Sequence, residues 1–411
     1  LKKIFFDIFD FTVFLFNLNK RNAIIENTEK VIWLAETGAR DFIPRLAQAI
    51  SLWNEYSIPS IVIHKHYLKQ LDHKVLKNSV VIDKSATFNC IRRLRYSKLN
   101  GAFNIVIPEE LLICDKLQSQ IKGCLNPKTL NYIDLVACDP VQIESYINSL
   151  KNNIKLVDID NPRLSTGLIE NNCSRFFDEK INIESFINRE FILINDKLCL
   201  KFSSLDDEFE ILRNEVFRYT GVNSKKYIEK YMIEEEKSER LLIKLIKNIR
   251  LKKEFNNFII IIRPHPTVDL NKYENYFKDK LNPSLDFKII REGTALEWMK
   301  KAKIIFHNNC TTAIEGHFSG LENIFNYSDK LREGTSDKYQ KILKPIGIEE
   351  SIKKALNINL KNNQITNISA LKDYQENNKE LFKFLGNSMK PRSKILSGNY
   401  LIKKFKDAYI K

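Results

Sequence analysis

FIIIIRPHP (residues 258–266) is the stretch that decides the fold. Its consecutive apolar residues, Phe258 to Ile262, are typical of a strand that is buried on both faces of a parallel sheet. Similar apolar stretches follow at 287–290 and 303–306, and helical spacing over 295–301 separates these two. Strands that alternate with helices predict an α/β domain with a doubly wound parallel sheet.

A polar cluster follows each of these strands. The clusters read RPHP (263–266), REGT (291–294) and HNNCTT (307–312), and a helix is expected at 313–318, directly after the last of them. Ligands of open parallel sheets bind outside the carboxyl ends of the strands. Polar clusters at neighbouring strand ends therefore predict a binding site along this edge.

The first half of the chain repeats the same alternation. Strands are expected at 31–36, 60–64, 80–82, 103–107 and 154–159, and helices at 42–56 and 129–150. The 411 residues suit two domains of roughly 100–200 residues each. We therefore expect an α/β protein with two Rossmann-like doubly wound domains, whose parallel sheets face a cleft. The expected parts are an amphipathic N-terminal segment (1–25), a first domain (26–185), a second domain (186–385) and a basic C-terminal tail (386–411).

The N-terminal segment combines several Phe and Leu residues with Asp7 and Asp10. A signal peptide would have an uninterrupted apolar core, so two interpretations remain: an amphipathic helix that lies on a membrane or a partner, or a helix packed on the first domain. No apolar run reaches the ~18–20 residues of a membrane-spanning helix.

The net charge of +15 suits an anionic partner, such as nucleic acid, a phosphate-rich substrate or an acidic membrane surface. The alternative is a Lys-rich composition with solvated surfaces, because the lysines are spread along the whole chain. The seven cysteines contain no C-x-x-C pair, which predicts reduced thiols, no zinc site and no disulfide framework. The P-loop and dinucleotide-binding fingerprints are both absent. We expect no metal and no cofactor.

The second domain supplies most of the candidate ligand contacts. Arg263 offers a planar fork of donors to a phosphate or a carboxylate. His265, held between two prolines, would donate a hydrogen bond to a leaving phosphate or transfer a proton. The alternative is a structural turn with a buried histidine. Glu292 and Gly293 form either a ligand contact or a plain turn, since glycine lets a ligand approach the backbone.

The 307–312 cluster stands directly before a helix. Thr311 and Thr312, together with the free N–H groups of the first turn, make either an anion site or a simple N-cap. Asn309 belongs to the same turn and is expected to contact the ligand. Glu315, one turn into the helix, either holds sugar hydroxyls or is solvated.

Charged residues also follow the strands of the first domain. Glu109 and Glu110 are adjacent, and repulsion between neighbouring carboxylates favours protonation of one, which suits a general base or a nucleophile. The alternative is an acid-rich helix start. Four more residues at this edge are expected to face a ligand, unless they form local ion pairs: Glu36, Arg40, Asp41 and Lys84.

RPHP at 263–266 and HNNCTTAIE at 307–315 resemble the RPHP and HNGCTTAIEA segments of bacterial surface-polysaccharide and capsule glycosyltransferases of GT-B type. The resemblance is greatest to enzymes that use CMP-activated acidic sugars, such as Kdo or nonulosonic acids of the pseudaminic, legionaminic or sialic type. It covers most of residues 30–330. It implies a GT-B fold in which the second domain holds most of the donor nucleotide.

The resemblance also implies roles for individual residues. His265 and the turn formed by Thr311 and Thr312 would bind the CMP phosphate or the sugar carboxylate. Glu109 and Glu110 would act on the acceptor side. The family carries a glycine after this acid pair, where this chain has Leu111, so Asp41, Asp158 and Asp160 stay further candidates for the catalytic acid. Asn309 also stands where a glycine is common.

Our leading hypothesis is a metal-independent, cytoplasmic glycosyltransferase, peripheral to the inner face of the cytoplasmic membrane. It would move an acidic sugar from a CMP-sugar donor to a glycan or lipid-linked glycan acceptor of a capsule or lipopolysaccharide. Glu110 or Glu109 would act as base or nucleophile, and His265 would stabilise the leaving CMP phosphate.

Three other interpretations are open. Two are enzymes: a polyol-phosphate transferase of the teichoic-acid kind and a nucleotide-sugar epimerase. The third is a basic scaffold that binds a membrane or nucleic acid. Because the chain lacks an aromatic–basic RNA motif and a recognition helix, we expect no nucleic-acid partner.

Overall fold

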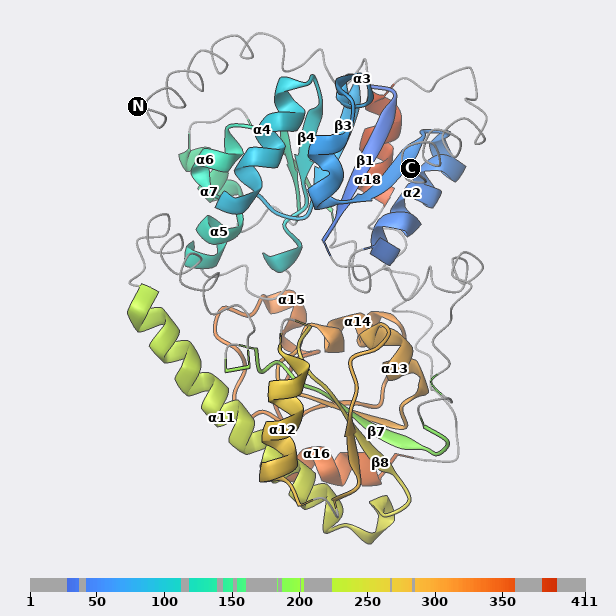
Figure 1. The fold of residues 1–411 in the computed structure, drawn as a ribbon, viewed down its shortest axis with the longest axis vertical. Coiled ribbons are helices and arrows are strands. Elements are labelled where there is room, and N and C mark those ends of the chain that lie inside the picture. The colour runs from blue at the N-terminus through green and yellow to red at the C-terminus, as the bar shows by residue number, and fades with distance from the viewer. Residues whose placement is uncertain are drawn as a thin grey trace.

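The computed structural model describes residues 28–36, 42–111, 118–138, 143–150, 154–159, 183, 187–199, 201–202, 224–266, 268–282, 285–358 and 379–389. These residues form two α/β domains, which Figure 1 shows one above the other. The expected N-terminal segment lies outside the described residues, and so do Arg40, Asp41 and residues 390–411.

The first domain is built on a six-stranded parallel sheet with the order β2-β1-β3-β4-β5-β6. Its strands are β1 (Lys30–Ala35), β2 (Ser60–His64), β3 (Ser79–Asp83), β4 (Phe103–Val106), β5 (Leu135–Ala137) and β6 (Lys155–Val157). All of β3 is buried, and so is β1 after Lys30. The strand order reverses between β1 and β3, since β2 pairs with the other side of β1. Ligands of doubly wound sheets bind at such a reversal.

Helices and short turns connect these strands. The helices are α2 (Ile43–Tyr56), α3 (His73–Leu76), α4 (Ile91–Leu99), α5 (Gln118–Cys124), α6 (Pro127–Leu130) and α7 (Glu144–Ser149), and the 3₁₀ turns are η4 (Lys65–Gln70), η5 (Phe88–Cys90) and η6 (Glu109–Leu111). The expectation of one helix over 129–150 is wrong, because β5 and its connections lie inside this range.

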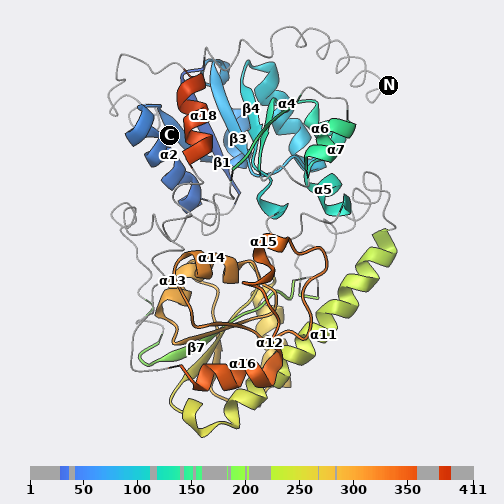
Figure 2. The same cartoon turned by 180° about the vertical axis from the view of Figure 1, so that it is seen from behind.

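A helix near the C-terminus, α18 (Lys379–Ser388), packs on the first domain although it follows the second in sequence. Leu381, Phe382 and Leu385 join the core of the first domain, and Figure 2 shows α18 beside α2. Gly386 faces the ring of Tyr56 so closely that a Cβ atom would overlap it. The expected second domain ends at residue 385, whereas this packing assigns α18 to the first domain.

The second domain is built on a five-stranded parallel sheet with the order β11-β10-β7-β8-β9. Its strands are β7 (Phe191–Asn195), β8 (Ile259–Arg263), β9 (Phe287–Ile289), β10 (Ile304–His307) and β11 (Ile324–Asn326). Its helices are α11 (Ser224–Arg250), α12 (Leu270–Lys280), α13 (Ala295–Lys301), α14 (Thr312–Phe318), α15 (Asp337–Gln340) and α16 (Gly347–Leu356), with the 3₁₀ turn η8 (Lys253–Phe255). Two all-parallel sheets of this kind confirm the expected α/β fold of two Rossmann-like domains.

The strand that opens the deciding stretch is buried on both faces, as its apolar run predicts. In β8, Ile260 and Ile262 pack into one core cluster, and Ile259 and Ile261 into the cluster on the opposite face of the sheet. Each fully buried Ile side chain contributes about 1.5–3 kcal/mol of transfer free energy. β8 therefore holds the two helical layers of the domain together.

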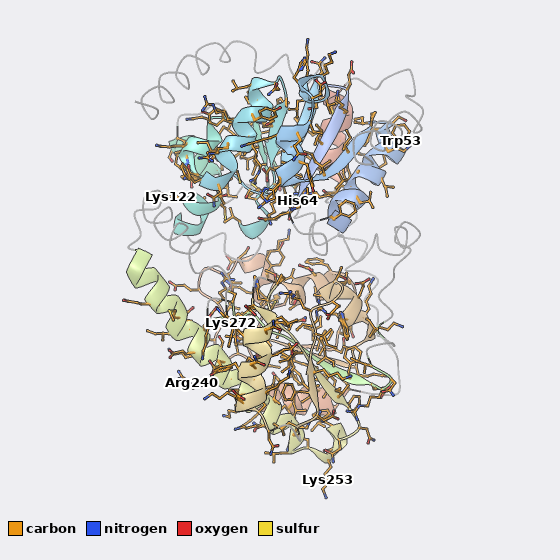
Figure 3. The ribbon with its side chains drawn as sticks, viewed as in Figure 1. Trp53, His64, Lys122, Arg240, Lys253 and Lys272 are labelled. Carbon is orange, nitrogen blue, oxygen red and sulfur yellow. The ribbon has the colours of Figure 1, made fainter. Side chains whose placement is uncertain are left out.

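The carboxyl edges of the two sheets face each other. In Figure 3, His64 at the end of β2 lies on the side of the first domain nearest the second. Lys253, which precedes β8, lies at the far end of the second domain, and Lys272, which follows β8, lies nearer to the first. The residues that follow the strands of both sheets therefore lie between the two sheets. None of the helices in the described ranges is both long and apolar enough to cross a lipid bilayer.

Candidate functional site

The turn between β10 and α14 is held by a side-chain network. Asn309 has a φ of 51°, in the left-handed region that few residues other than glycine adopt. Its amide nitrogen donates to Ser328 Oγ (3.0 Å) and to the carbonyl of Lys330 (2.9 Å). Its amide oxygen accepts from Asn326 Nδ2 (2.8 Å). The amide that was expected to contact a ligand is thus occupied in holding the turn.

His307 is a neutral hydrogen-bond acceptor at the end of β10. Its Nδ1 accepts from the backbone N–H of Cys310 (3.3 Å). Burial, and then the charge of Lys197, lower the pKa of His307 to about 3. The residue therefore keeps the turn in place without carrying charge at neutral pH.

The two threonines of the turn differ in their surroundings. The hydroxyl of Thr312 accepts from Asn195 Nδ2 (3.1 Å) and donates to Cys310 Sγ (3.2 Å), which links the turn to β7. The half-buried hydroxyl of Thr311 makes no hydrogen bond to any residue that the structure describes. Glu315 lies within the first turn of α14. Of the three predicted contacts in this helix start, Thr311 is the one whose side chain has no partner among the described residues.

Two cations that were not among the predicted site residues, Lys197 and Arg332, lie next to this turn. Lys197 follows the end of β7, and its partly buried ammonium makes no hydrogen bond or ion pair with the described part of the chain. Burial, and then the charge of Arg332, lower the pKa of Lys197. The charge of Lys197 acts in turn on His307 and Cys310. The sequence signal that could have identified Lys197 is its position two residues beyond a buried strand, in FILINDK (191–197).

Asp196 fixes the backbone from which Lys197 projects. Its Oδ1 accepts from the N–H of Lys197 (2.8 Å), and its Oδ2 accepts from the hydroxyl of Tyr273 (2.5 Å). Complete burial raises the pKa of Asp196 to about 6, although these hydrogen bonds oppose the rise. Asp196 is thus a structural acid behind the site.

Arg263 is committed to the loop that follows β9. Its Nη1 donates to the carbonyl of Glu292 (2.6 Å), and its Nη2 donates to the carbonyls of Arg291 (3.3 Å) and Gly293 (2.9 Å). The guanidinium lies 5.6 Å from the ring centroid of Trp298. Burial lowers the pKa of Arg263 to about 10. The fork of donors that was expected to bind a phosphate instead holds a backbone loop.

His265 lies half-buried in the turn after β8, where its carbonyl accepts from the N–H of Val268 (3.2 Å). β7 lies between β8 and β10, so the ends of β8 and β10 are two strand spacings apart, about 10 Å. His265 and Thr311 therefore start from opposite sides of Lys197. The sheet order brings the RPHP and HNNCTT clusters to one edge, as predicted.

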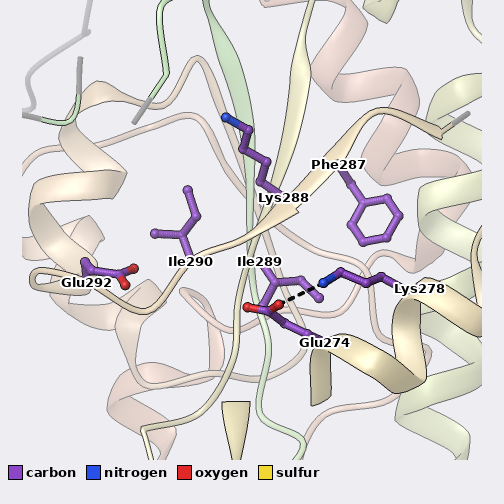
Figure 4. A pocket seen from close by; sticks show the side chains of 7 residues that line it. All are labelled: Glu274, Lys278, Phe287, Lys288, Ile289, Ile290 and Glu292. Carbon is purple, nitrogen blue, oxygen red and sulfur yellow. Dashed lines mark hydrogen bonds and ion pairs between the residues drawn. The ribbon is translucent and has the colours of Figure 1, made fainter. Parts of the chain in front are cut away.

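Glu292 has a different environment from the other predicted contacts. Its exposed side chain lines a pocket of about 640 Å³ against the edge strand β9 (Figure 4). The other lining residues are Glu274, Lys278, Phe287, Lys288, Ile289 and Ile290. Gly293 follows with a φ of 69°, which explains the glycine by backbone conformation. This pocket lies along the outer strand of the sheet, away from the central strand ends.

In the first domain, Glu36 and Lys84 meet at the reversal of strand order, in an ion pair of the kind given as the alternative to a ligand contact. The carboxylate of Glu36 forms ion pairs with Lys84 and with Lys65. Burial raises its pKa, but the hydrogen bonds and charges of the two lysines outweigh burial and lower the pKa to about 2. His64 Nε2 lies 2.7 Å from the carbonyl of Glu36. Glu36 is therefore a permanent anion and not a proton acceptor at neutral pH.

Glu109 is not exposed to a ligand. Its Oε1 lies 2.6 Å from Arg45 Nη2, and the two side chains are 2% and 1% exposed. Arg45 also donates to Gln48 Oε1 (3.1 Å). This buried ion pair gives Glu109 a structural partner, whereas the side chain of Glu110 lies outside what the structure describes. Among the described residues, no cluster of His, Cys, Asp or Glu is arranged to hold a metal ion.

Comparison with known proteins gives matches at the level of the fold. No protein-family model and no curated protein matches the sequence. The structure is similar to S. aureus MnaA in a co-structure with UDP, with a TM-score of 0.50 and 11% identity over 88% of this chain and 94% of that chain. It is also similar to UDP-GlcNAc 2-epimerase from Methanocaldococcus jannaschii, with a TM-score of 0.49 and 13% identity over 84% of this chain and 99% of that chain. The first of these similarities agrees with the two-domain α/β fold.

Proposed function

We propose that the protein is a sugar-nucleotide enzyme, and specifically a metal-independent glycosyltransferase that moves an acidic sugar from a CMP donor to a surface glycan. The observation that carries the proposal is the position of the HNNCTT turn. It lies beside the central strand β7, at a carboxyl edge that faces the carboxyl edge of the other sheet. A donor bound at one edge and an acceptor at the other would meet between the domains.

In this mechanism, the acceptor hydroxyl attacks the anomeric carbon of the donor sugar. The new C–O bond forms as the bond between the anomeric carbon and the phosphate oxygen breaks, and CMP leaves with the bonding electrons. Glu110 takes the proton of the acceptor hydroxyl, with Asp41 as the alternative base. His265 donates a hydrogen bond to the leaving phosphate, where negative charge develops. The net charge of +15 favours action at an anionic inner membrane surface.

The second candidate is an enzyme that acts on a UDP-sugar, such as an epimerase. This candidate is favoured by the likeness to S. aureus MnaA, which has a TM-score of 0.50, because that structure is a co-structure with UDP. Such an enzyme would isomerise its substrate and release no nucleotide when the cycle is complete.

The test is incubation of the purified protein with CMP-Kdo, CMP-nonulosonic acids and UDP-sugars, followed by liquid chromatography and mass spectrometry. We expect release of CMP from one of the CMP-sugars. His265→Ala should lower this rate about 10²- to 10⁴-fold. The matched control is His73→Asn, an exposed histidine on α3 at the end of the first domain away from the second.

Two results would contradict the proposal. The first is that no CMP-sugar is bound or turned over. The second is that His265→Ala and His73→Asn retain the same rate as the unmodified protein. An isomerised UDP-sugar without transfer would select the second candidate.

A further inference from the structure

We propose that Lys197 and Arg332 form a binding subsite for a doubly negative, phosphate-bearing group at the carboxyl end of β7, next to Thr311. The chemical class is the phosphate part of a nucleotide or nucleotide sugar. The identity of that ligand rests on the proposed function, whereas the subsite itself rests on the positions of Lys197, Arg332 and Thr311.

The backbone on both sides of the subsite is fixed. Asp196 holds the N–H of Lys197 at 2.8 Å, and Asp196 is itself held by Tyr273. Arg332 lies two residues beyond Lys330, whose carbonyl accepts from Asn309 in the β10–α14 turn (2.9 Å). Asn195 donates to the hydroxyl of Thr312 (3.1 Å), so three segments that are distant in sequence, at 195–197, 307–312 and 328–335, are tied together at one place.

The carbonyl of Arg332 anchors its own loop, because it accepts from the N–H (3.3 Å) and the hydroxyl (2.6 Å) of Thr335. The guanidinium of Arg332 makes no hydrogen bond or ion pair within the described ranges. The charge of Arg332 acts on Lys197. The ammonium of Lys197 likewise makes no hydrogen bond or ion pair with the described residues. The subsite is thus built from two cations on hydrogen-bonded backbone, and neither head group has a hydrogen-bond or ion-pair partner among the described residues.

Two neighbouring cations of this kind repel each other. Burial and then the charge of Arg332 lower the pKa of Lys197, and these effects outweigh the opposing effects of Cys310, Glu234 and Asp196. Asp196 is already hydrogen-bonded to Tyr273 and to the backbone. A ligand with two negative charges would relieve the repulsion, and the hydroxyl of Thr311 would add a neutral donor.

Two donors meet this requirement. A CMP-linked acidic sugar carries one negative charge on its phosphate and one on its carboxylate, and a UDP-sugar carries two on its diphosphate. Cytidine and uridine carry none. The positive charge of the subsite is therefore expected to make nucleotides bind more tightly than nucleosides, whether the donor is a CMP-sugar or a UDP-sugar.

The experiment is titration calorimetry of the full chain with CMP, UDP, pyrophosphate, cytidine and uridine. The variants are Lys197→Met, Arg332→Gln and the double variant, and the conservative variant is Lys197→Arg. The control is Lys253→Met, an exposed lysine at the far end of the second domain. Each single variant should weaken binding of pyrophosphate and of the preferred nucleotide about 10- to 100-fold. Lys197→Arg should restore most of the affinity, and Lys253→Met should match the unmodified protein.

The proposal is overturned if Lys197→Met and Arg332→Gln bind these anions as tightly as the unmodified protein, or if nucleosides bind as tightly as nucleotides. Urea unfolding of each variant establishes whether it is folded. If Lys197→Met does not fold, Arg332→Gln still tests the subsite, because Arg332 lies in a loop. Binding that depends on both cations, without turnover of any sugar nucleotide, would support the subsite and refute the transferase. If the protein turns over a CMP-sugar and Lys197→Met leaves that rate unchanged, the transferase would be supported and the subsite refuted.

Discussion

Replacement of Glu109 by Gln is expected to destabilise the first domain because it leaves Arg45 buried without its counter-ion. The two side chains are 2.6 Å apart and almost fully buried, and Arg45 also lies 5.7 Å from the ring centroid of Trp33. Removing one partner of a buried ion pair costs about 3–5 kcal/mol. For a domain of this size, 1 kcal/mol shifts the melting temperature by roughly 2–4 °C, so we expect a fall of about 6–20 °C.

Thermal unfolding followed by circular dichroism measures this fall. Glu55→Gln is the matched control, because Glu55 is an exposed acid on α2, the helix that carries Arg45. It should change the free energy of unfolding by less than about 0.5 kcal/mol. The double variant Arg45→Met, Glu109→Leu should recover most of the stability, since an apolar pair can replace a buried ion pair.

A Glu109→Gln variant that melts like the unmodified protein but loses turnover would refute this reasoning. It would return Glu109 to the catalytic role that its sequence position suggests.

Three further predictions follow from the second domain. Arg263→Lys cannot reach the same carbonyls around Glu292 and should lose about 2–4 kcal/mol in urea unfolding; a loss below 0.5 kcal/mol would contradict its structural role. The folded pKa of Asp196, about 6, lies above its ordinary 3.8, so the folded state binds the proton more tightly and this stability is lost as pH rises from 3.8 to 6. Asp196→Asn should therefore raise the free energy of unfolding by about 3 kcal/mol at pH 7.5 and leave it unchanged at pH 4. An equal change at both pH values would contradict the raised pKa of Asp196. Asn309→Ala should cost more stability than Asn309→Gly by about 1 kcal/mol, because only glycine adopts a φ of 51° freely; equal losses would mean that only the amide matters.

The fold was largely predictable because its central strands are buried on both faces. β1, β3 and β8 appear in the sequence as unbroken apolar runs with polar ends. β5 was missed because it has three residues and lies between two short helices, so its apolar residues also fit helical spacing. The docking of α18 on the first domain was not predictable, since it rests on tertiary packing of Leu381, Phe382 and Leu385 in the core and of Gly386 against Tyr56.

The site was predictable in place but not in detail. Strand order follows from βαβ topology, so the polar clusters were correctly brought to the carboxyl edges. Which side chain faces a ligand depends on which donors the fold itself uses, and local sequence does not reveal this. Arg263 and Asn309 are occupied by backbone carbonyls and neighbouring side chains, whereas the head groups of Lys197 and Arg332 have no such partner within the described ranges.

The central claim is that a nucleotide phosphate binds at the end of β7, between Lys197 and the β10–α14 turn. The most direct measurement is a crystal structure of the protein soaked with CMP, with UDP as the second soak. We predict phosphate density within hydrogen-bonding distance of Lys197 and Thr311. Phosphate density in the pocket beside Glu292 and β9, with Lys197 left unliganded, would contradict the account.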